Sequence, residues 1–121
     1  MLLDTAFFID LADEEKARRA GPCSAWLRAH RQHTKRVSVI TLGEYAVGSS
    51  ARETLRFFRG YQPVALGAAT TISAGRLQAS MDFEMGENDL WIAATALRFG
   101  WPLVTRDKAF ARVPGLKVIG Y

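Results

Sequence analysis

Short apolar segments alternate with helical patterns along the whole chain, and no other feature limits the possible folds as strongly. The apolar segments are only a few residues long and several are rich in β-branched residues, which is typical of buried strands. They are residues 2–3, 37–40, 63–66, 102–105 and 116–119. Strands that alternate with helices favour a parallel sheet with helices on both faces. We therefore expect an α/β fold with a central, mostly parallel sheet of about five strands.

The intervening segments carry helical signals of different strength. The helices that we expect cover residues 6–11, 13–32 with a break at Gly21-Pro22, 41–49, 51–60, 68–82 and 89–99. The last of these has the clearest pattern, because its apolar residues recur at helical spacing: Leu90, Ala93, Ala94 and Leu97. We expect Asn88 to cap this helix and Gly100 to end it, and we expect Gly60 to end the helix over residues 51–60.

Length, cysteine content and charge limit the class of protein. The chain has 121 residues, which is one ordinary domain over residues 1–121, and 49% of them are hydrophobic, enough for a core. Cys23 is the only cysteine, so no intrachain disulfide or Cys-based zinc site is possible. The N-terminal segment is a poor signal peptide and no apolar run is long enough to cross a membrane, so we expect a cytoplasmic protein without a membrane partner. A net charge of +4 is compatible with a nucleic-acid partner, but it also suits a merely soluble basic protein.

Several acidic residues fall near the carboxyl ends of the predicted strands. Asp4 follows the first strand, Glu44 lies in the first turn of the helix after the second, and Asp107 follows the fourth. Asp89 opens the helix that returns the chain to the start of the fourth strand, so that helix begins near the same edge. Open α/β sheets bind ligands at this edge. We therefore expect these carboxylates to lie close together.

Taken singly, each acid has a structural explanation. Thr41 and Glu44 match a capping box, and Asp89 suits the positive end of a helix. Asp107 suits a turn, and Asp4 suits a helix cap. Taken together, anions in one half-buried crevice repel one another unless some protonate or a cation compensates. Mg²⁺ and Mn²⁺ prefer carboxylate oxygens, and such an ion can activate water for attack on a phosphodiester, so the set favours metal-dependent hydrolysis of phosphodiester bonds.

Segments of the chain, in their order and spacing, resemble the PIN-domain ribonucleases, and specifically the VapC-type toxins of toxin–antitoxin pairs. The matching segments are "LLDTAFFIDL", "SVITLGEYAVG", "NDLWIAATAL" and "PLVTRDKAFARVPGLKVI". The resemblance covers essentially the whole chain and is weakest between residues 12 and 34. It implies a single PIN-like domain with three layers, α/β/α, and cleavage of RNA by an endoribonuclease that depends on Mg²⁺ or Mn²⁺. It also implies a cognate antitoxin and a homodimer.

The resemblance assigns the acidic residues to an active site. Asp4, Glu44, Asp89 and Asp107 match the acidic active-site positions of the family, and all are candidate metal ligands. Asp4 and Asp89 match the positions most often assigned to direct magnesium binding. The resemblance therefore turns a cluster of carboxylates into a predicted catalytic metal site.

Neighbouring residues match the family less uniformly. Thr105 resembles a small polar residue that supports the site, and Thr5 is expected to support it beside the first aspartate. Ala6 stands where the family often has asparagine, so a polar contact near that aspartate is missing here. Glu87 is a further acid near the site, and we place it at the rim without a ligand role.

Basic residues near the predicted site are candidates for contact with RNA. Arg106 and Lys108 flank Asp107, so we expect them to meet a phosphate of the substrate. Residues 28–36 hold more basic side chains and two histidines, but a solvated helix end is the favoured interpretation there.

Two other classes of function remain open at this point. The first is a PIN-fold module that binds nucleic acid or protein without catalysis, and the presence of every expected acid argues against it. The second is a phosphotransfer domain of the receiver or haloacid-dehalogenase type. The dehalogenase type needs a second Asp two residues after Asp4, where this chain has Ala6, and the receiver pattern fits no better.

Overall fold

The structure is built on one five-stranded sheet, and each neighbouring pair of strands is parallel. The computed structural model describes residues 1–121. The strands are β1 (Leu2–Leu3), β2 (Arg36–Ser38), β3 (Gln62–Val64), β4 (Leu103–Val104) and β5 (Val118–Ile119). Their order in the sheet is β3-β2-β1-β4-β5. The predicted parallel sheet is therefore confirmed, although every strand except β1 is shorter than the sequence indicated.

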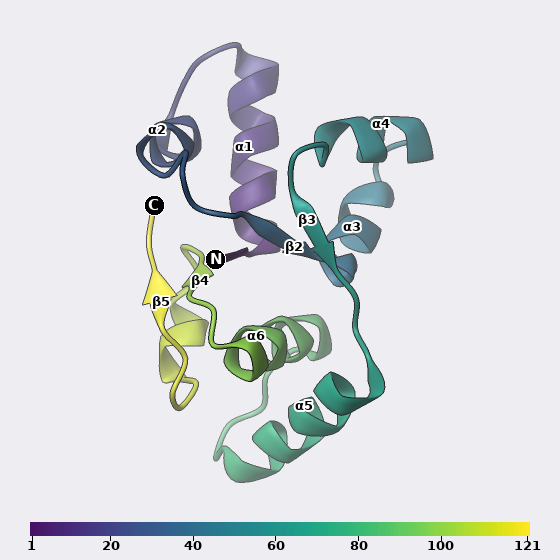
Figure 1. The fold of residues 1–121 in the computed structure, drawn as a ribbon, viewed down its shortest axis with the longest axis vertical. Helices are drawn as coiled ribbons and strands as arrows, with labels where there is room; N and C mark the ends of the chain where they lie inside the picture. The colour runs from purple at the N-terminus through teal and green to yellow at the C-terminus, as the bar shows by residue number, and fades with distance from the viewer.

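Helices cover the sheet on both sides (Figure 1). They are α1 (Thr5–Ala17), α2 (Pro22–Ala29), α3 (Val39–Ala46), α4 (Ala51–Phe57), α5 (Ala68–Ser80), α6 (Glu87–Phe99) and the short 3₁₀ helix η1 (Lys108–Arg112). Figure 1 shows α1, α2 and α4 on one side of the sheet, with α5 and α6 on the other. This arrangement is the three-layer α/β/α fold.

The core lies on both faces of the sheet, because consecutive strand residues point in opposite directions. Leu3 and Val104 pack in a cluster that includes Phe7 of α1. Leu2 and Leu103, one position earlier in each strand, pack in a second cluster with side chains of α6. Strands buried in this way read as continuous apolar runs, which explains why the sequence showed no polar alternation within them.

The prediction for the second strand is wrong at its carboxyl end, and the helix that follows begins two residues earlier than expected. Residues 37–40 were expected to be extended, but α3 already begins at Val39. The Ser38 hydroxyl accepts a hydrogen bond from the Ile40 backbone N–H at 3.1 Å and so caps α3. A serine cap within an apolar, β-branched segment therefore overrides the strand propensity of the residues after it.

Several helices also begin or end at residues other than those predicted. The residue that caps α6 is Gly86 rather than Asn88, which lies inside the first turn. The end of α6 at Gly100 is confirmed, since this glycine has a φ of 68°. Helix α4 ends at Phe57, and Gly60 lies beyond it in the turn that leads to β3. Helix α1 is one continuous helix where two segments were expected, whereas the predicted start of α2 at Pro22 is confirmed.

No helix of this fold combines the length and the apolar character that crossing a bilayer requires.

Candidate active site

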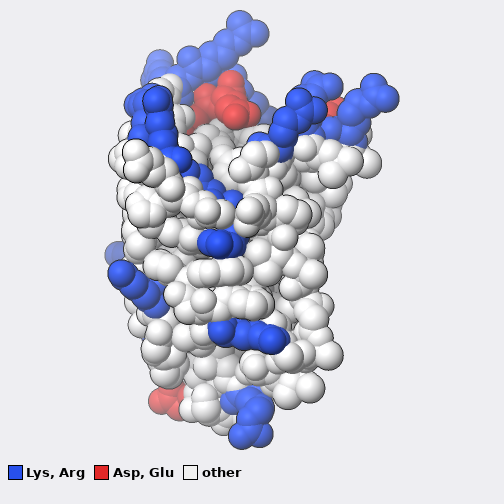
Figure 2. Space-filling model, in the orientation of Figure 1, with Lys and Arg blue, Asp and Glu red and all other residues white.

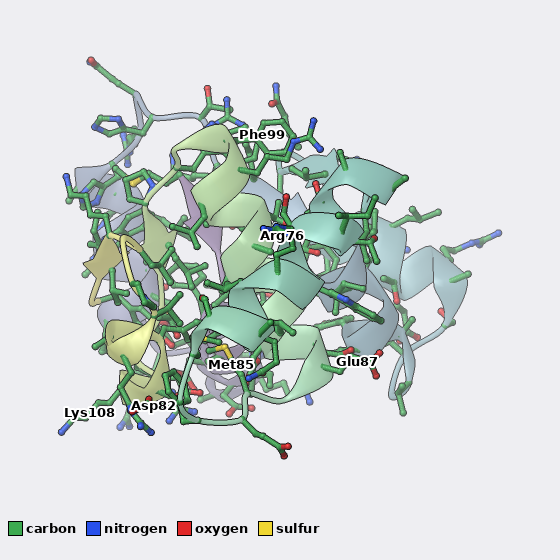
Figure 3. The ribbon with its side chains drawn as sticks, turned by 90° about the horizontal axis from the view of Figure 1, so that it is seen from below. Arg76, Asp82, Met85, Glu87, Phe99 and Lys108 are labelled. Carbon is green, nitrogen blue, oxygen red and sulfur yellow. The ribbon has the colours of Figure 1, made fainter.

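The fold brings the expected residues to one edge of the sheet. Strands β2, β1 and β4 are neighbours, so the residues that follow them emerge side by side. The first turn of α6 lies at this edge too, since Glu87, Asn88 and Asp89 line one recess together with Glu44. Figure 3 shows Glu87, in the first turn of α6, and Lys108, after β4, at the same end of the molecule, with Phe99 at the opposite end.

Asp4 is the most deeply placed of the acids. The residue is 3% exposed, and its Oδ2 accepts a hydrogen bond from the Thr105 hydroxyl at 2.8 Å. Its Oδ1 is buried and has no hydrogen-bond partner. Asp4 is the N-cap residue of α1, as expected, but its side chain makes no capping hydrogen bond. Burial raises the pKa of Asp4, while the hydrogen bond from Thr105 and the nearby amides of Thr5 and Ala6 oppose that rise. A buried carboxylate oxygen without a donor is costly unless a proton or a cation lies beside it.

Thr105 forms hydrogen bonds to both Asp4 and Asp107. Its hydroxyl donates to Asp4 and accepts a hydrogen bond from the Asp107 backbone N–H at 3.0 Å. The Asp107 side chain accepts from the Ala109 N–H at 2.9 Å and caps η1, so its expected role in a turn is confirmed. Thr105 therefore holds both the buried carboxylate and the loop that carries the exposed one.

Glu44 is held by a threonine of another helix, and the predicted capping box is wrong. Glu44 is the sixth residue of α3, not a first-turn residue, and Thr41 lies within the helix. The Thr5 hydroxyl donates to Glu44 Oε1 at 2.9 Å and lies 2.9 Å from the Thr41 hydroxyl. Because Thr5 gives its one proton to Glu44, Thr41 donates to Thr5. The fully buried Thr41 thus supports Thr5, whereas the sequence pattern predicted a helix cap for it.

Asp89 lies near the other acids, since it lines one recess together with Glu44. Burial is the largest cause and the negative charges of Asp4, Asp107 and Glu44 follow in that order; together they raise the pKa of Asp89 from 3.8 to about 6. An open recess of about 420 Å³ beside it is lined only by polar residues and one glycine: Glu44, Gly86, Glu87, Asn88 and Asp89. Glu87 is exposed at this recess, as expected of a rim residue.

The donor set fits a hydrated divalent cation. No group of three or more acidic, histidine or cysteine side chains is close enough to chelate an ion directly. Mg²⁺, however, binds proteins through one or two carboxylates and keeps several waters, so a preformed cage is not required. The unpaired Oδ1 of Asp4 and the raised pKa of Asp89 are both features that a cation at this edge would relieve.

The basic residues beside the site differ from one another. Arg106 Nε forms an ion pair with Asp10 Oδ2 at 2.6 Å, whereas Lys108 is exposed and makes no ion pair. Asp10 was not predicted to lie near the site, and the one signal for it in the sequence is an acid within an otherwise apolar helix segment. Farther away, the Lys35 ammonium group donates to the His30 backbone carbonyl at 2.6 Å. Within residues 28–36, this lysine therefore bonds to the end of helix α2.

The raised pKa of Asp89 predicts a dependence of stability on pH. Without divalent ions, the free energy of unfolding should fall as the pH rises from 3.8 to about 6. The folded state holds this proton more tightly than the unfolded chain does. The stabilisation is therefore complete below the unfolded pKa and is lost as the pH passes the folded one. Urea unfolding in EDTA at a series of pH values measures it, and Asp89→Asn should flatten the slope. An Asp89→Asn protein with the full slope would contradict the assignment.

Comparison with known proteins identifies the family. Residues 1–116 match the PIN domain family. The chain therefore belongs to the PIN domain family, in agreement with its three-layer fold. It is similar to Ribonuclease VapC4 of Mycobacterium tuberculosis (strain ATCC 25618 / H37Rv), with 32% identity over 97 residues that cover 69% of this chain and 74% of that protein. This likeness confirms the resemblance to VapC-type members of the family.

Solved structures of toxin–antitoxin complexes share this fold. VapBC2 from Rickettsia felis, bound to a DNA fragment from its promoter, is similar with a TM-score of 0.81 and 23% identity, covering 98% of this chain and 96% of that chain. A toxin–antitoxin complex from Klebsiella pneumoniae has a TM-score of 0.74 and 24% identity, covering 98% of this chain and 94% of that chain. At these identities the likeness concerns the fold, and it confirms the predicted PIN-like architecture.

Proposed function

We propose that this chain is a metal-dependent endoribonuclease that hydrolyses RNA phosphodiester bonds as the toxin of a VapBC-type pair. The observation that carries the proposal is the arrangement of the acids at one edge of the sheet: Thr105 bonds to Asp4 and to the backbone of Asp107, and Glu44 and Asp89 line one recess. Four carboxylates in this arrangement suit a divalent cation, and the bound cation could also bind a phosphate of an anionic substrate. The likeness to Ribonuclease VapC4 supports RNA as that substrate.

The acids have different parts in this proposal. Asp4 and Asp89 would hold Mg²⁺ or Mn²⁺ directly, and Asp107 and Glu44 would bind the remaining sides of the ion or its waters. When bound, the ion would supply a polarised water and positive charge beside the scissile phosphate. Burial of Asp4 fixes one carboxylate in place, while the exposure of Glu44 and Asp107 leaves the site open to a polymer.

Hydroxyl groups orient these acids, which reduces the cost of ordering them. Thr105 donates to Asp4, and Thr5 donates to Glu44. A carboxylate that is already held by a hydrogen bond loses little conformational freedom when an ion or a water binds. Thr5 and Thr105 are therefore supporting residues in the proposal, not ligands.

Lys108 and Arg106 are the basic groups best placed to meet the RNA backbone, because they flank Asp107 in the chain. On the face shown in Figure 2, Lys and Arg side chains are spread out and are not gathered into one stripe, while Asp and Glu appear only near the two ends. The net charge of +4 thus assists association with RNA over a broad surface, and specific phosphate contacts rest on the residues beside the site.

RNA cut at this site should carry 5′-phosphate and 3′-hydroxyl ends. Water is the proposed nucleophile, and attack by the RNA 2′-hydroxyl would instead require a base such as histidine and leave a cyclic phosphate. His30 is engaged elsewhere, since it stacks on Trp26 with ring centroids 4.0 Å apart and its Nδ1 lies 2.7 Å from the Trp26 carbonyl oxygen. Mass spectrometry of products from single-stranded RNA and Mn²⁺ measures the ends. Cyclic phosphate ends, or cutting in excess EDTA, would refute the proposal.

An antitoxin would inhibit the enzyme by placing a basic side chain among the carboxylates at the edge of the sheet. We call this group the acidic edge; it consists of Asp4, Glu44, Asp89 and Asp107. The carboxylates there are anionic without metal, and a guanidinium pairs well with carboxylates. The similar solved structures are complexes of toxins with antitoxins, which supports a partner of this kind. An arginine is the expected residue because its fork of donors can bind two carboxylate oxygens at once.

The chain should form a homodimer. Large apolar side chains are exposed on α4 and at the end of α3, where Leu55 is 72% exposed and Val47 is 91% exposed. Burying such side chains between two copies stabilises an assembly, since apolar surface of this kind is unfavourable in water. Sedimentation velocity at micromolar concentration should therefore show a dimer, and Leu55→Asp with Val47→Asp should shift it to monomer. A parent protein that sediments as a monomer without antitoxin would contradict this.

A further inference from the structure

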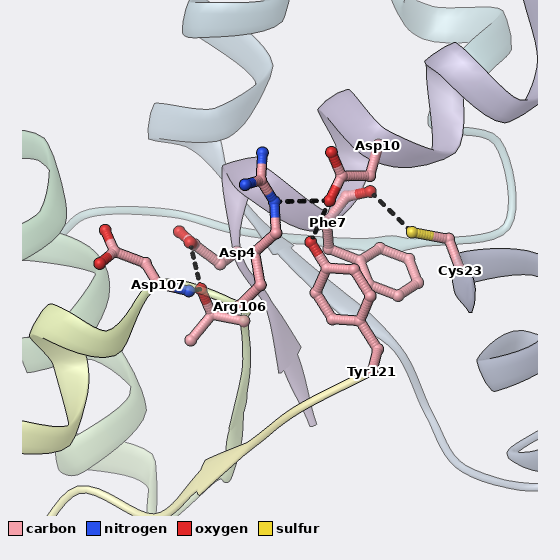
Figure 4. Close-up of polar contacts among 8 residues, drawn as sticks. Asp4, Phe7, Asp10, Cys23, Arg106, Asp107 and Tyr121 are labelled. Carbon is pink, nitrogen blue, oxygen red and sulfur yellow. Dashed lines mark hydrogen bonds and ion pairs between the residues drawn. The ribbon is translucent and has the colours of Figure 1, made fainter. Parts of the chain in front are cut away.

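Arg106 is tied to the last residue of the chain through Asp10 (Figure 4). Its Nε donates to Asp10 Oδ2 at 2.6 Å, and the Tyr121 hydroxyl donates to the same oxygen at 2.7 Å. The ring of Tyr121 packs edge-on against Phe7, with centroids 4.8 Å apart. Residues from α1, from the loop after β4 and from the end of the chain therefore meet around one carboxylate oxygen.

Stability alone does not explain this contact. The Arg106 side chain is 61% exposed and that of Asp10 is 28% exposed, and exposed ion pairs contribute only about 0–1 kcal/mol. The clearer consequence is conformational. A long and flexible side chain at the surface is held in one orientation by a carboxylate that is itself held by a packed tyrosine.

Arg106 belongs to the loop that carries part of the acidic edge. Arg106 follows Thr105, whose hydroxyl bonds to Asp4, and precedes Asp107. The ion pair uses Nε of Arg106, and Figure 4 shows its Nη nitrogens pointing away from Asp10. Without the anchor, a guanidinium in this position would pair with the carboxylates next to it. With the anchor, its Nη groups stay available as donors to another anion.

We propose that Asp10 and Tyr121 are positioning residues that hold Arg106 at the rim of the acidic edge, with its Nη groups directed to an RNA phosphate. The inference rests on the proposed function and adds to it the residues that prepare the phosphate contact. An arginine that is ordered before RNA arrives loses less conformational entropy on binding, so each hydrogen bond contributes more to affinity.

Tyr121→Phe tests the proposal with little change in packing, because it keeps the ring against Phe7 and removes only the hydroxyl. The affinity for a fluorescein-labelled single-stranded RNA of mixed sequence, measured by anisotropy in EDTA at low salt, should fall about three- to tenfold. Arg106→Ala should weaken binding more and reduce the slope of log affinity against log salt by about 0.7. Arg76→Ala, which removes an arginine on the outer helix α5 (Figure 3), is the matched control for lost charge.

A double-mutant cycle separates positioning from a structural effect. In the Arg106→Ala background, Tyr121→Phe should cause no further loss of RNA affinity, since it acts through that arginine. Nitrogen-15 NMR should show the Arg106 Nε–H exchanging slowly with water in the parent and faster in Tyr121→Phe.

Three outcomes would overturn the inference. They are an equal loss of affinity in both backgrounds, an Nε–H that exchanges equally in parent and Tyr121→Phe, and no change of affinity in Arg106→Ala. None of these readouts needs cleavage. Suppose that Tyr121→Phe weakens RNA binding only when Arg106 is present, but the protein never cuts RNA. That result would refute the nuclease proposal and would still support the positioning role.

Discussion

Asp89→Asn and Asp4→Asn should each lower the rate of RNA cleavage by at least about a hundredfold, because each removes a carboxylate charge at the centre of the proposed metal site. The fold should survive both changes. Burial raises the pKa of Asp4, so a neutral amide in its place removes a charge that the folded protein disfavours. Circular dichroism and the melting temperature in EDTA measure the fold, and a gel assay with Mn²⁺ measures cleavage.

Neighbouring residues offer matched controls for these variants. Glu87→Gln removes a charge two positions from Asp89 on the same helix, but at the exposed rim, and should cut RNA at the rate of the parent. His30→Ala should also cut normally, because its ring is occupied with Trp26. Acidic variants that cut as well as the parent would remove the nuclease assignment and favour a PIN-fold module that binds without catalysis.

The position of Asp4, Asp89 and Asp107 at one edge of the sheet could be predicted from the sequence because it depends only on topology. Once residues 2–3 and 102–105 are recognised as parallel strands, Asp4 and Asp107 must emerge at the same edge. Asp89 follows from the need to return the chain to the start of β4. These deductions use only the direction of each element, so errors of one or two residues in strand length do no harm.

The roles of the supporting hydroxyls could not be deduced in this way. Thr41 and Glu44 have the spacing of a capping box, and the local sequence cannot exclude it. The structure instead starts the helix at Val39 and joins Glu44 to Thr5, which lies 39 residues earlier. A contact over this separation depends on how α1 and α3 pack, and no local pattern encodes that.

The contacts of Arg106 are a stronger example of long-range contacts that no local sequence pattern predicts. Its position beside Asp107 indicated a phosphate contact, but its partner Asp10 and the Tyr121 hydroxyl were not predicted. The hydrogen bond between Tyr121 and Asp10 spans 111 residues of sequence. Only the order of the sheet, which sets β5 beside β4, brings the end of the chain near α1.

Divalent metal should raise the melting temperature of this protein by about 10 °C when the free ion is about a hundredfold above its dissociation constant. Metal bound only to the folded state stabilises it by mass action, and here it also relieves the repulsion around Asp89. Since protons compete for that carboxylate, the stabilisation should weaken as the pH falls through about 6. Differential scanning fluorimetry in Mn²⁺ and in EDTA, across pH, measures both effects. Identical melting curves with Mn²⁺ and with EDTA would show that the proposed site does not bind metal.

A second acidic region makes the position of the bound ion a separate question. The loop between α5 and α6 carries Asp82 and Glu84 beside another recess, of about 600 Å³. An ion bound there would also raise the melting temperature. Asp89→Asn should therefore remove most of the Mn²⁺ effect, while the double variant Asp82→Asn with Glu84→Gln should keep it. The reverse pattern would place the stabilising ion in the loop and leave the edge of the sheet without metal, because thermal stabilisation alone does not distinguish two carboxylate clusters on one small domain.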